Sequence, residues 1–221
     1  PMLDGSAYSY VQALQVSGRR VQKAFRRFIR LLHPIHVQDG NRTATLLPAS
    51  SELSLSVSCD YRVHGIGRQL YTTHITTEIF SKDIASARTF GFFEDVDKLR
   101  AQGLAQGSSL ENAIVFSGGT LMNPEGLRFP DEIVRHKVLD VLGDLALLGY
   151  PLMAHFTGEN TGHALNAQLT AALLKNTSCW AISENPYEKS KQYAIFTDVK
   201  SFVKSSSSAF NLPVSACASH K

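Results

Sequence analysis

The clearest pattern in the chain is the strict alternation of apolar and polar residues in ELSLSVSCDY, residues 52–61. A period of two is typical of a β-strand that buries one face and exposes the other. Before it, Asp39-Gly40 marks a tight turn between two short β segments, and after it QLYTTHIT (69–76) is rich in β-prone residues. The first third of the chain therefore predicts antiparallel strands.

Two later segments carry apolar residues three or four positions apart, which is typical of amphipathic helices. The longer one covers about residues 131–148, where Pro130 stands at the start and Gly149 with Pro151 ends the pattern. The second begins near residue 161 and covers HALNAQLTAALL. Strands followed by helices indicate an α+β protein.

Two shorter helices are expected as well. One covers residues 92–102, where Phe93 and Val96 lie on the apolar face. The other covers RRVQKAFRRFIRLL, residues 19–32, whose Arg and Lys residues would make it a basic amphipathic helix. Such a basic face could bind an anionic membrane or nucleic acid, although the solvated face of an ordinary helix or strand is the commoner explanation.

Composition narrows the class of protein. The 221 residues suffice for one large domain or two small ones, and the net charge of +3 is too small to indicate nucleic acid. No apolar run approaches the roughly 18 residues of a membrane-spanning helix, and the first residues lack the features of a signal peptide. Cys59, Cys179 and Cys217 are odd in number and have no CxxC spacing, which favours a reducing compartment.

The apolar stretch RHKVLDVLGDLALLG, residues 135–149, carries the candidate chemistry. His136, Asp140 and Asp144 are spaced by four and share one face of the expected helix. An imidazole beside a carboxylate can bind zinc, but the same residues could equally form a polar stripe that faces solvent. His163, near the start of the next helix, could be a cap, a core residue, a third ligand or a proton donor.

Four segments together resemble one known family: PMLDGSA at the start, RTFGFFEDVDKLRAQGLAQGSSLENAIV (88–115), LMNPEGLRFPDEIVRHKVLDVLGDLALLG (121–149) and TGHALNAQL (161–169). They are similar to UDP-3-O-acyl-N-acetylglucosamine deacetylase, a zinc hydrolase of lipid A biosynthesis. The resemblance covers about residues 1–174 and keeps the order of the motifs.

The resemblance implies an α+β fold built from two-layer units, each a sheet packed on helices. Residues 1–34 would be a remnant of the first unit, and residues 35–174 the second unit with an acyl-passage insert at about 86–115. Residues 175–221 would be a poorly defined tail.

The resemblance also implies a role for each site residue. His136 and Asp140 would bind zinc, and Asp144 would pair with His163, which serves as a charged partner or general acid. The other implied contacts are Thr89 to the oxyanion, Lys137 to the substrate diphosphate, Phe90 to the sugar, Phe93 and Val96 to the acyl chain, and Tyr61 near the uridine.

The implied reaction is hydrolysis of the N-acetyl group of a UDP-linked acylated glucosamine, in which zinc polarises the amide carbonyl and activates a water molecule. The implied protein is a monomer of the bacterial cytoplasm, or of an organelle if the source is eukaryotic. It would have no transmembrane segment and no nucleic-acid partner.

The sequence departs from the family at two points. The family's third zinc ligand and its general base lie upstream of PMLDGSA, where this chain has no segment, and two ligands are too few for a catalytic zinc. A truncated enzyme is therefore expected; the alternative is a catalytically inactive binding protein of the same fold. Asn160 stands where the family usually has a basic residue near the nucleotide.

Overall fold

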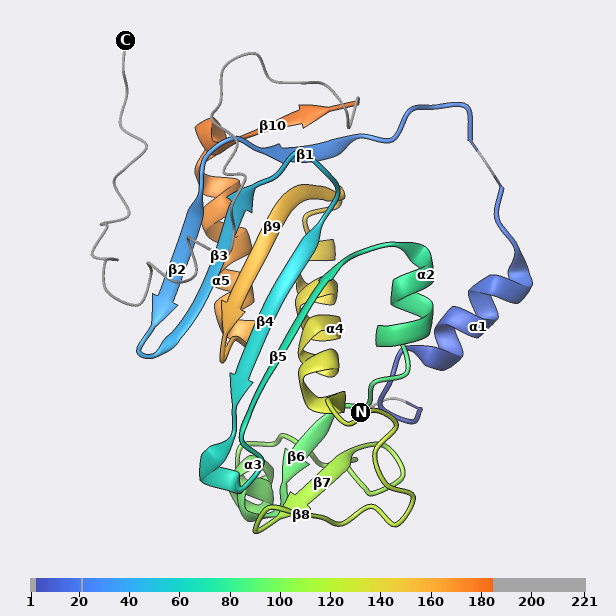
Figure 1. Ribbon diagram of the computed structural model, residues 1–221, viewed down its shortest axis with the longest axis vertical. Helices are drawn as coiled ribbons and strands as arrows, with labels where there is room; N and C mark the ends of the chain where they lie inside the picture. The colour runs from blue at the N-terminus through green and yellow to red at the C-terminus, as the bar shows by residue number, and fades with distance from the viewer. Residues whose placement is uncertain (1–2, 21, 185–221) are drawn as a thin grey trace.

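A mixed sheet of seven strands forms the centre of the molecule, and two long helices, α4 and α5, cover one of its faces (Figure 1). The structure is a computed structural model that describes residues 3–20 and 22–184. The strands of this sheet are β1 (Phe28–Leu31), β2 (Ile35–Asp39), β3 (Arg42–Pro48), β4 (Ser54–Asp60), β5 (Arg68–His74), β9 (Leu152–Glu159) and β10 (Trp180–Ser183). A smaller sheet contains β6 (Phe90–Phe92), β7 (Ile114–Ser117) and β8 (Thr120–Leu121).

The helices connect and cover these strands. The α-helices are α1 (Tyr8–Ser17), α2 (Thr77–Ile79), α3 (Val96–Ala101), α4 (Glu132–Ala146) and α5 (His163–Lys175). Short turns of other helical types are η1 (Arg62–His64), η2 (Phe80–Ile84), η3 (Phe93–Asp95) and η4 (Thr177–Cys179). Among the described residues, no helix is both long enough and apolar enough to cross a membrane.

Strand β9 organises the large sheet. Its residues 155–159 lie between β3, which is antiparallel, and β4, which is parallel, while its first residues pair with β1. Phe156 and Ala154 of β9 are completely buried, as a central strand covered by helices requires. Helix α4 contacts β4 and β5, and α5 contacts β2 and β3, so the two helices lie side by side on the sheet.

Most elements expected from the sequence are confirmed. Strands β2 and β3 pair around the turn at Asp39-Gly40, and Gly40 has the positive φ of 60° that such turns use. Leu55 and Val57 of β4 are fully buried, in agreement with the alternating pattern. Helices α4 and α5 begin within two residues of the expected positions, and η3 with α3 forms the short helical segment. The α+β fold class is thereby confirmed.

The basic helix expected over residues 19–32 is wrong. Residues 28–31 form β1, which pairs with β9 and β10, and the helix of this region is α1, further upstream. Ile29 and Leu31 are buried by strands that lie more than a hundred residues later in the chain. Tertiary contacts therefore override the local helical spacing, as they often do for short segments.

The expected division of the chain at residue 34 stays a prediction. Strand β1 lies before this position and pairs with β9, which lies after it. Residues 177–183 form η4 and β10, and β10 pairs with β1. The rest of the expected tail, residues 185–221, lies outside the described residues.

The small sheet and α3 lie beyond the first turn of α4, next to the tip of the β4–β5 hairpin (Figure 1). Contact between hairpin and small sheet is close, because a Cβ atom on Gly65 would lie 2.8 Å from the Cα atom of Gly119. The rings of His64 and Phe92 stack beside it with their centroids 3.7 Å apart. The small sheet and its β7–β8 turn thus pack closely against the tip of this hairpin.

His155 of β9 is a histidine buried in the core. Its side chain is buried, Nδ1 lies 2.7 Å from the Ser54 hydroxyl, and Nε2 has no hydrogen-bond partner in the part of the chain that the structure describes. Burial lowers the pKa of His155 below the usual value of 6.5.

A lowered histidine pKa means that the unfolded state binds more protons below about pH 6.5, so stability falls as the pH falls through that value. We expect the free energy of unfolding to decline from about pH 7.5 to about pH 5.5 less steeply in His155→Asn than in the unmodified protein. Denaturant titrations across this range measure the slope. His74→Asn, which removes an exposed imidazole, is the control and should keep the original slope. Equal slopes for all three proteins would contradict the claim that His155 is buried and neutral in the folded state.

Candidate active site

Helix α4 presents one line of polar side chains at intervals of four residues: Glu132, His136, Asp140 and Asp144. Val134, Val138 and Val141 on the same helix are completely buried. The side chains of His136 and Asp140 are only 11% and 15% exposed, so this polar line is largely removed from solvent. The solvent-facing stripe that the sequence also allowed is not what the structure shows.

His136 is held in one orientation. Its Nδ1 atom lies 3.0 Å from the carbonyl oxygen of Ala87, and because a carbonyl oxygen only accepts, Nδ1 must carry a hydrogen. The other nitrogen, Nε2, lies 3.3 Å from Oδ1 of Asp140. A lone pair on Nε2 would face the carboxylate, so a cation between the two groups would relieve their repulsion.

Asp140 remains a carboxylate in this setting. Its second oxygen, Oδ2, accepts a hydrogen bond from Nζ of Lys137 at 3.2 Å. Burial by itself would raise the pKa of Asp140, but the hydrogen bond from His136 and the charges of Lys137 and His163 outweigh it and lower the pKa. The side chain is thus available as an anionic ligand at neutral pH.

A second imidazole–carboxylate pair lies one turn further along α4. His163 is the first residue of α5, and its Nδ1 atom lies 3.0 Å from both oxygens of Asp144. The side-chain amide of Asn166 donates to the same carboxylate at 2.8 Å. Nε2 of His163 lies 3.7 Å from Oδ1 of Asp140, and the ring is 71% exposed. The structure therefore brings all four predicted polar residues of α4 and α5 together, with His163 open to solvent.

His136 and Asp140 have the spacing that two zinc ligands require. Two ligands placed 2.0–2.1 Å from zinc at a tetrahedral angle are about 3.3 Å apart, which agrees with the 3.3 Å between Nε2 of His136 and Oδ1 of Asp140. A ligating histidine also usually donates its other ring hydrogen to a carbonyl or carboxylate, as His136 does to Ala87. Within residues 3–20 and 22–184, however, no group of three potential ligands is present. The pair fits two positions of a zinc site and leaves the third to be supplied.

Aromatic rings connect this pair to the small sheet. Phe90 lies perpendicular to the His136 ring with centroids 6.4 Å apart, and Tyr61 packs on Phe90 at 5.4 Å. Thr89 precedes Phe90; its backbone N–H donates to Gly5 and its carbonyl accepts from Ile114, each at 2.8 Å. Thr89, Phe90 and Tyr61, which are predicted to contact the substrate, therefore lie near the His136–Asp140 pair.

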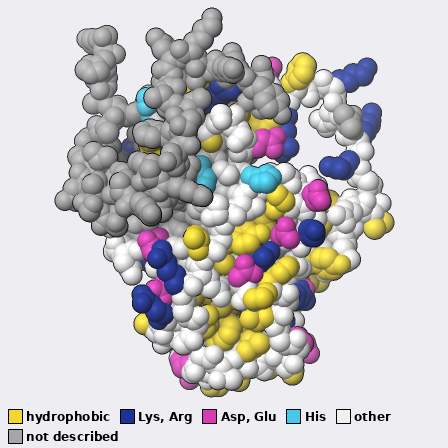
Figure 2. Space-filling view, in the orientation of Figure 1, with side chains coloured by type: hydrophobic (Ala, Val, Ile, Leu, Met, Phe, Trp, Pro, Cys, Tyr) yellow, Lys and Arg dark blue, Asp and Glu magenta, His cyan; other side chains and the backbone are white. Residues whose placement is uncertain are grey.

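The two predicted acyl-passage residues lie on the small unit, which is the small sheet together with η3 and α3. Phe93 belongs to η3 and is 56% exposed, and Val96 begins α3 and is half-buried. Figure 2 shows apolar side chains gathered over the lower part of the molecule. Val63 and Leu70 of the adjoining β4–β5 hairpin are also exposed.

Asn160 has a structural position. Its backbone adopts a φ of 49°, and its side-chain oxygen accepts a hydrogen bond from the Asp60 backbone N–H at 2.8 Å. Asparagine tolerates this left-handed conformation better than most residues, so the residue closes the turn between β9 and α5. The Asn160 side chain thus holds the backbone at the end of β4.

Sequence reasoning missed three residues that support the site. Asn166 follows His163 by three positions, one helical turn, and Glu132 precedes His136 by four, so both spacings were visible in the sequence. Arg88, which is bonded to Glu132, lies 44 residues from it and gave no local signal.

A buried, helix-borne imidazole–carboxylate pair beside a second histidine–carboxylate pair is typical of hydrolases that use a metal ion and acid–base catalysis. Comparison with known proteins identifies the family. Residues 1–175 match the family model described as LpxC: UDP-3-O-acyl N-acetylglycosamine deacetylase. The chain belongs to this family, which confirms the resemblance found in the sequence.

Individual relatives agree. The UDP-3-O-acyl-N-acetylglucosamine deacetylase of Phenylobacterium zucineum is 43% identical over 182 residues, which are 82% of this chain and 62% of the relative. The enzyme of the same name from Acidithiobacillus ferrooxidans is 44% identical over 181 residues, 81% of this chain and 60% of the relative. That of Myxococcus xanthus is 42% identical over 182 residues, 82% and 58% respectively. The chain thus spans about three fifths of the length of these relatives.

Proposed function

We propose that the full-length protein containing this chain hydrolyses the N-acetyl group of UDP-3-O-acyl-N-acetylglucosamine, with zinc held by His136, Asp140 and a third donor. The observation that carries the proposal is the orientation of His136, whose Nε2 faces Oδ1 of Asp140 while Nδ1 is bound to Ala87. About two fifths of each relative's length lies outside the part matched here, and that extra part is where we expect the third donor and the general base.

Zinc supplies a Lewis acid that polarises the acetamide carbonyl and makes a water molecule more nucleophilic. The chain supplies the proton for the leaving amine. His163 is suited to this task because its ring is exposed to the site and Asp144 stabilises the charged imidazolium. The start of α5 disfavours a cation at this position, so the carboxylate of Asp144 is needed to offset the helix dipole.

The remaining residues would bind and orient the substrate. We assign Thr89 to the developing oxyanion and Phe90 to the sugar, because their backbone is fixed against Gly5 and Ile114. Tyr61, which packs on Phe90, is assigned to the uridine. Lys137 is assigned to the diphosphate, for which its ammonium would share or exchange its contact with Asp140.

The exposed apolar side chains of the small unit suit a fatty acyl chain. Phe93 and Val96 belong to this surface, which continues onto the β4–β5 hairpin (Figure 2). A hydrocarbon chain lying on such residues would gain roughly 0.8 kcal/mol for each buried methylene group. We therefore assign the acyl end of the substrate to this unit.

The inactive binding protein is the weaker alternative, because the curated relatives are named as deacetylases. An active enzyme would also explain why His163 and Asp144 are held together so closely. A monomeric state and a location in the bacterial cytoplasm stay predictions of the same proposal.

His136→Ala tests the metal assignment in the full-length protein. We expect the variant to lose most of its bound zinc, about one ion per chain, and at least about 100-fold in acetate release, because a catalytic zinc needs three protein ligands. Elemental analysis and an acetate assay on the UDP-sugar measure the two effects. His74→Ala removes an imidazole from the end of β5 and should leave both values unchanged. Full activity in His136→Ala would refute the assignment.

Asp144→Asn and His163→Gln test the proton-transfer pair. Each change should lower kcat by about 10²–10⁴-fold while zinc content is kept, because neither residue is assigned as a ligand. The double variant should be little worse than the worse single one, because the two side chains act as a unit. Steady-state kinetics measure these values, with Leu147→Ala at the exposed end of α4 as control. Effects that multiply would show that the two residues act independently.

A further inference from the structure

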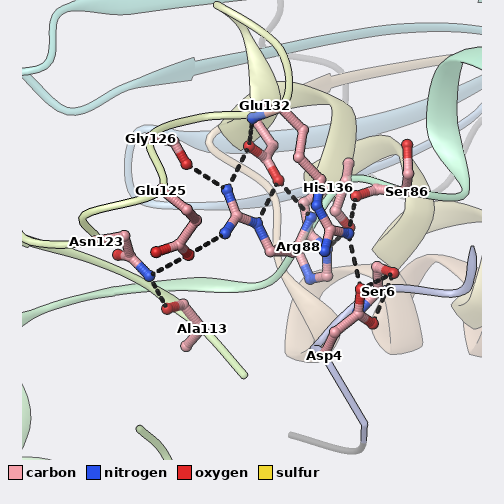
Figure 3. Close-up of polar contacts among 12 residues, drawn as sticks. Asp4, Ser6, Ser86, Arg88, Ala113, Asn123, Glu125, Gly126, Glu132 and His136 are labelled. Atoms are coloured by element: carbon pink, nitrogen blue, oxygen red, sulfur yellow. Dashed lines mark hydrogen bonds and ion pairs between the residues drawn. The ribbon is translucent and has the colours of Figure 1, made fainter. Parts of the chain in front are cut away.

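A buried ion pair joins the first turn of α4 to the segment before β6 (Figure 3). The side chains of Arg88 and Glu132 are 4% and 0% exposed. Nε of Arg88 donates to Oε1 of Glu132 at 2.9 Å, and Nη2 donates to Oε2 at 3.2 Å. Nη1 and Nη2 also donate to Glu125 at 2.6 Å and to the Gly126 carbonyl at 2.8 Å, so the guanidinium is held on several sides.

The Glu132 carboxylate is equally well satisfied. Its Oε1 accepts a further hydrogen bond from the backbone N–H of Arg88 at 3.0 Å, and its Oε2 accepts one from the backbone N–H of Arg128 at 2.6 Å. A buried ion pair of this kind often stabilises a protein no more than apolar residues of the same size would. Its presence here points to a requirement for a particular geometry.

That geometry concerns a single peptide unit. The carbonyl oxygen of Ala87 and the N–H of Arg88 belong to the same peptide bond. The N–H donates to Glu132, and the carbonyl oxygen accepts from Nδ1 of His136. Because the peptide is planar and trans, fixing the N–H also fixes the direction of the carbonyl. A carboxylate, a peptide and an imidazole therefore form one hydrogen-bonded chain.

The neighbouring residues hold the same segment in place. The Ser86 carbonyl accepts from Nη1 of Arg128 at 2.9 Å, and the Thr89 N–H donates to Gly5. Arg128 in turn pairs with Asp4 at 2.8 Å. The peptide between residues 87 and 88 therefore has little freedom to rotate.

We propose that Glu132 is a positioning residue for His136 and acts through the peptide unit between Ala87 and Arg88. This inference rests on the proposed function, in which His136 binds zinc through Nε2. In many metal sites a carboxylate bonds directly to the ligating histidine, fixes its tautomer and increases its basicity. Here the same effect passes through one peptide, since a carboxylate bound to the N–H polarises the carbonyl on its other side.

The test compares Glu132→Gln with Glu125→Gln in the full-length protein. Both residues contact Arg88, but Glu125 is 50% exposed and bonds to the Arg88 side chain, whereas Glu132 also accepts from the N–H of the peptide unit; Glu125 is therefore a matched control. We expect Glu132→Gln to weaken zinc affinity roughly 10-fold or more, as loss of such supporting contacts does elsewhere. Competition with a chelator measures the affinity, and Glu125→Gln should stay close to the unmodified protein.

A second readout separates positioning from general destabilisation. In the metal-free protein, ¹⁵N chemical shifts of the His136 ring report which nitrogen carries the hydrogen. We expect Nδ1 to carry a hydrogen in the unmodified protein and in Glu125→Gln, and to carry it in only part of the molecules in Glu132→Gln. If Glu132→Gln does not fold, the paired replacement Arg88→Met with Glu132→Met removes both charges together, and the same two readouts apply to it.

Unchanged zinc affinity and an unchanged tautomer in Glu132→Gln would overturn the inference, as would equal losses in the two glutamate variants. These outcomes differ from a failure of the proposed function. If His136→Ala kept zinc and activity, the metal assignment would fail. The ring tautomer of the metal-free protein would still decide whether Glu132 positions His136.

Discussion

The site depends on the hydrogen bond from Nδ1 of His136 to the Ala87 carbonyl. This bond decides that Nε2, and not Nδ1, faces Asp140, and it leaves Nε2 able to bind a cation. Asp140 lies on a helix whose other faces are packed into the core, where an uncompensated carboxylate would cost more than the roughly 2–7 kcal/mol of a neutral polar group without a hydrogen bond. A cation bound between His136 and Asp140 therefore helps to stabilise the buried carboxylate on α4. The proposed reaction needs a cation at the same place.

The fold brings the participants together from distant parts of the chain. Strand β9 aligns the large sheet so that α4 and α5 lie side by side on one face, which places His163 against Asp144 across the two helices (Figure 1). The segment before β6 crosses the first turn of α4 and supplies the Ala87 carbonyl. The small sheet follows directly from this segment. The same segment therefore holds both the proposed acyl surface and the imidazole of His136 in place.

The sequence predicts those parts that depend on local spacing and misses those that depend on distant partners. The periods of β4, α4 and α5 could be recognised, and with them the line from His136 to Asp144. Residues 19–32 were misjudged because β1 exists only by pairing with β9 and β10. The pairing of Arg88 with Glu132 joins positions 44 apart, and no local pattern announces it. Roles of individual residues in substrate binding came from the family resemblance alone.

The most direct test of the central claim is the position and coordination of zinc in a crystal structure of the full-length protein, located by anomalous scattering at the zinc absorption edge. The account predicts a single strong peak about 2.0–2.2 Å from Nε2 of His136 and from a carboxylate oxygen of Asp140, with Nδ1 of His136 still bound to the Ala87 carbonyl. A peak at other residues, or zinc bound through Nδ1 of His136, would contradict it.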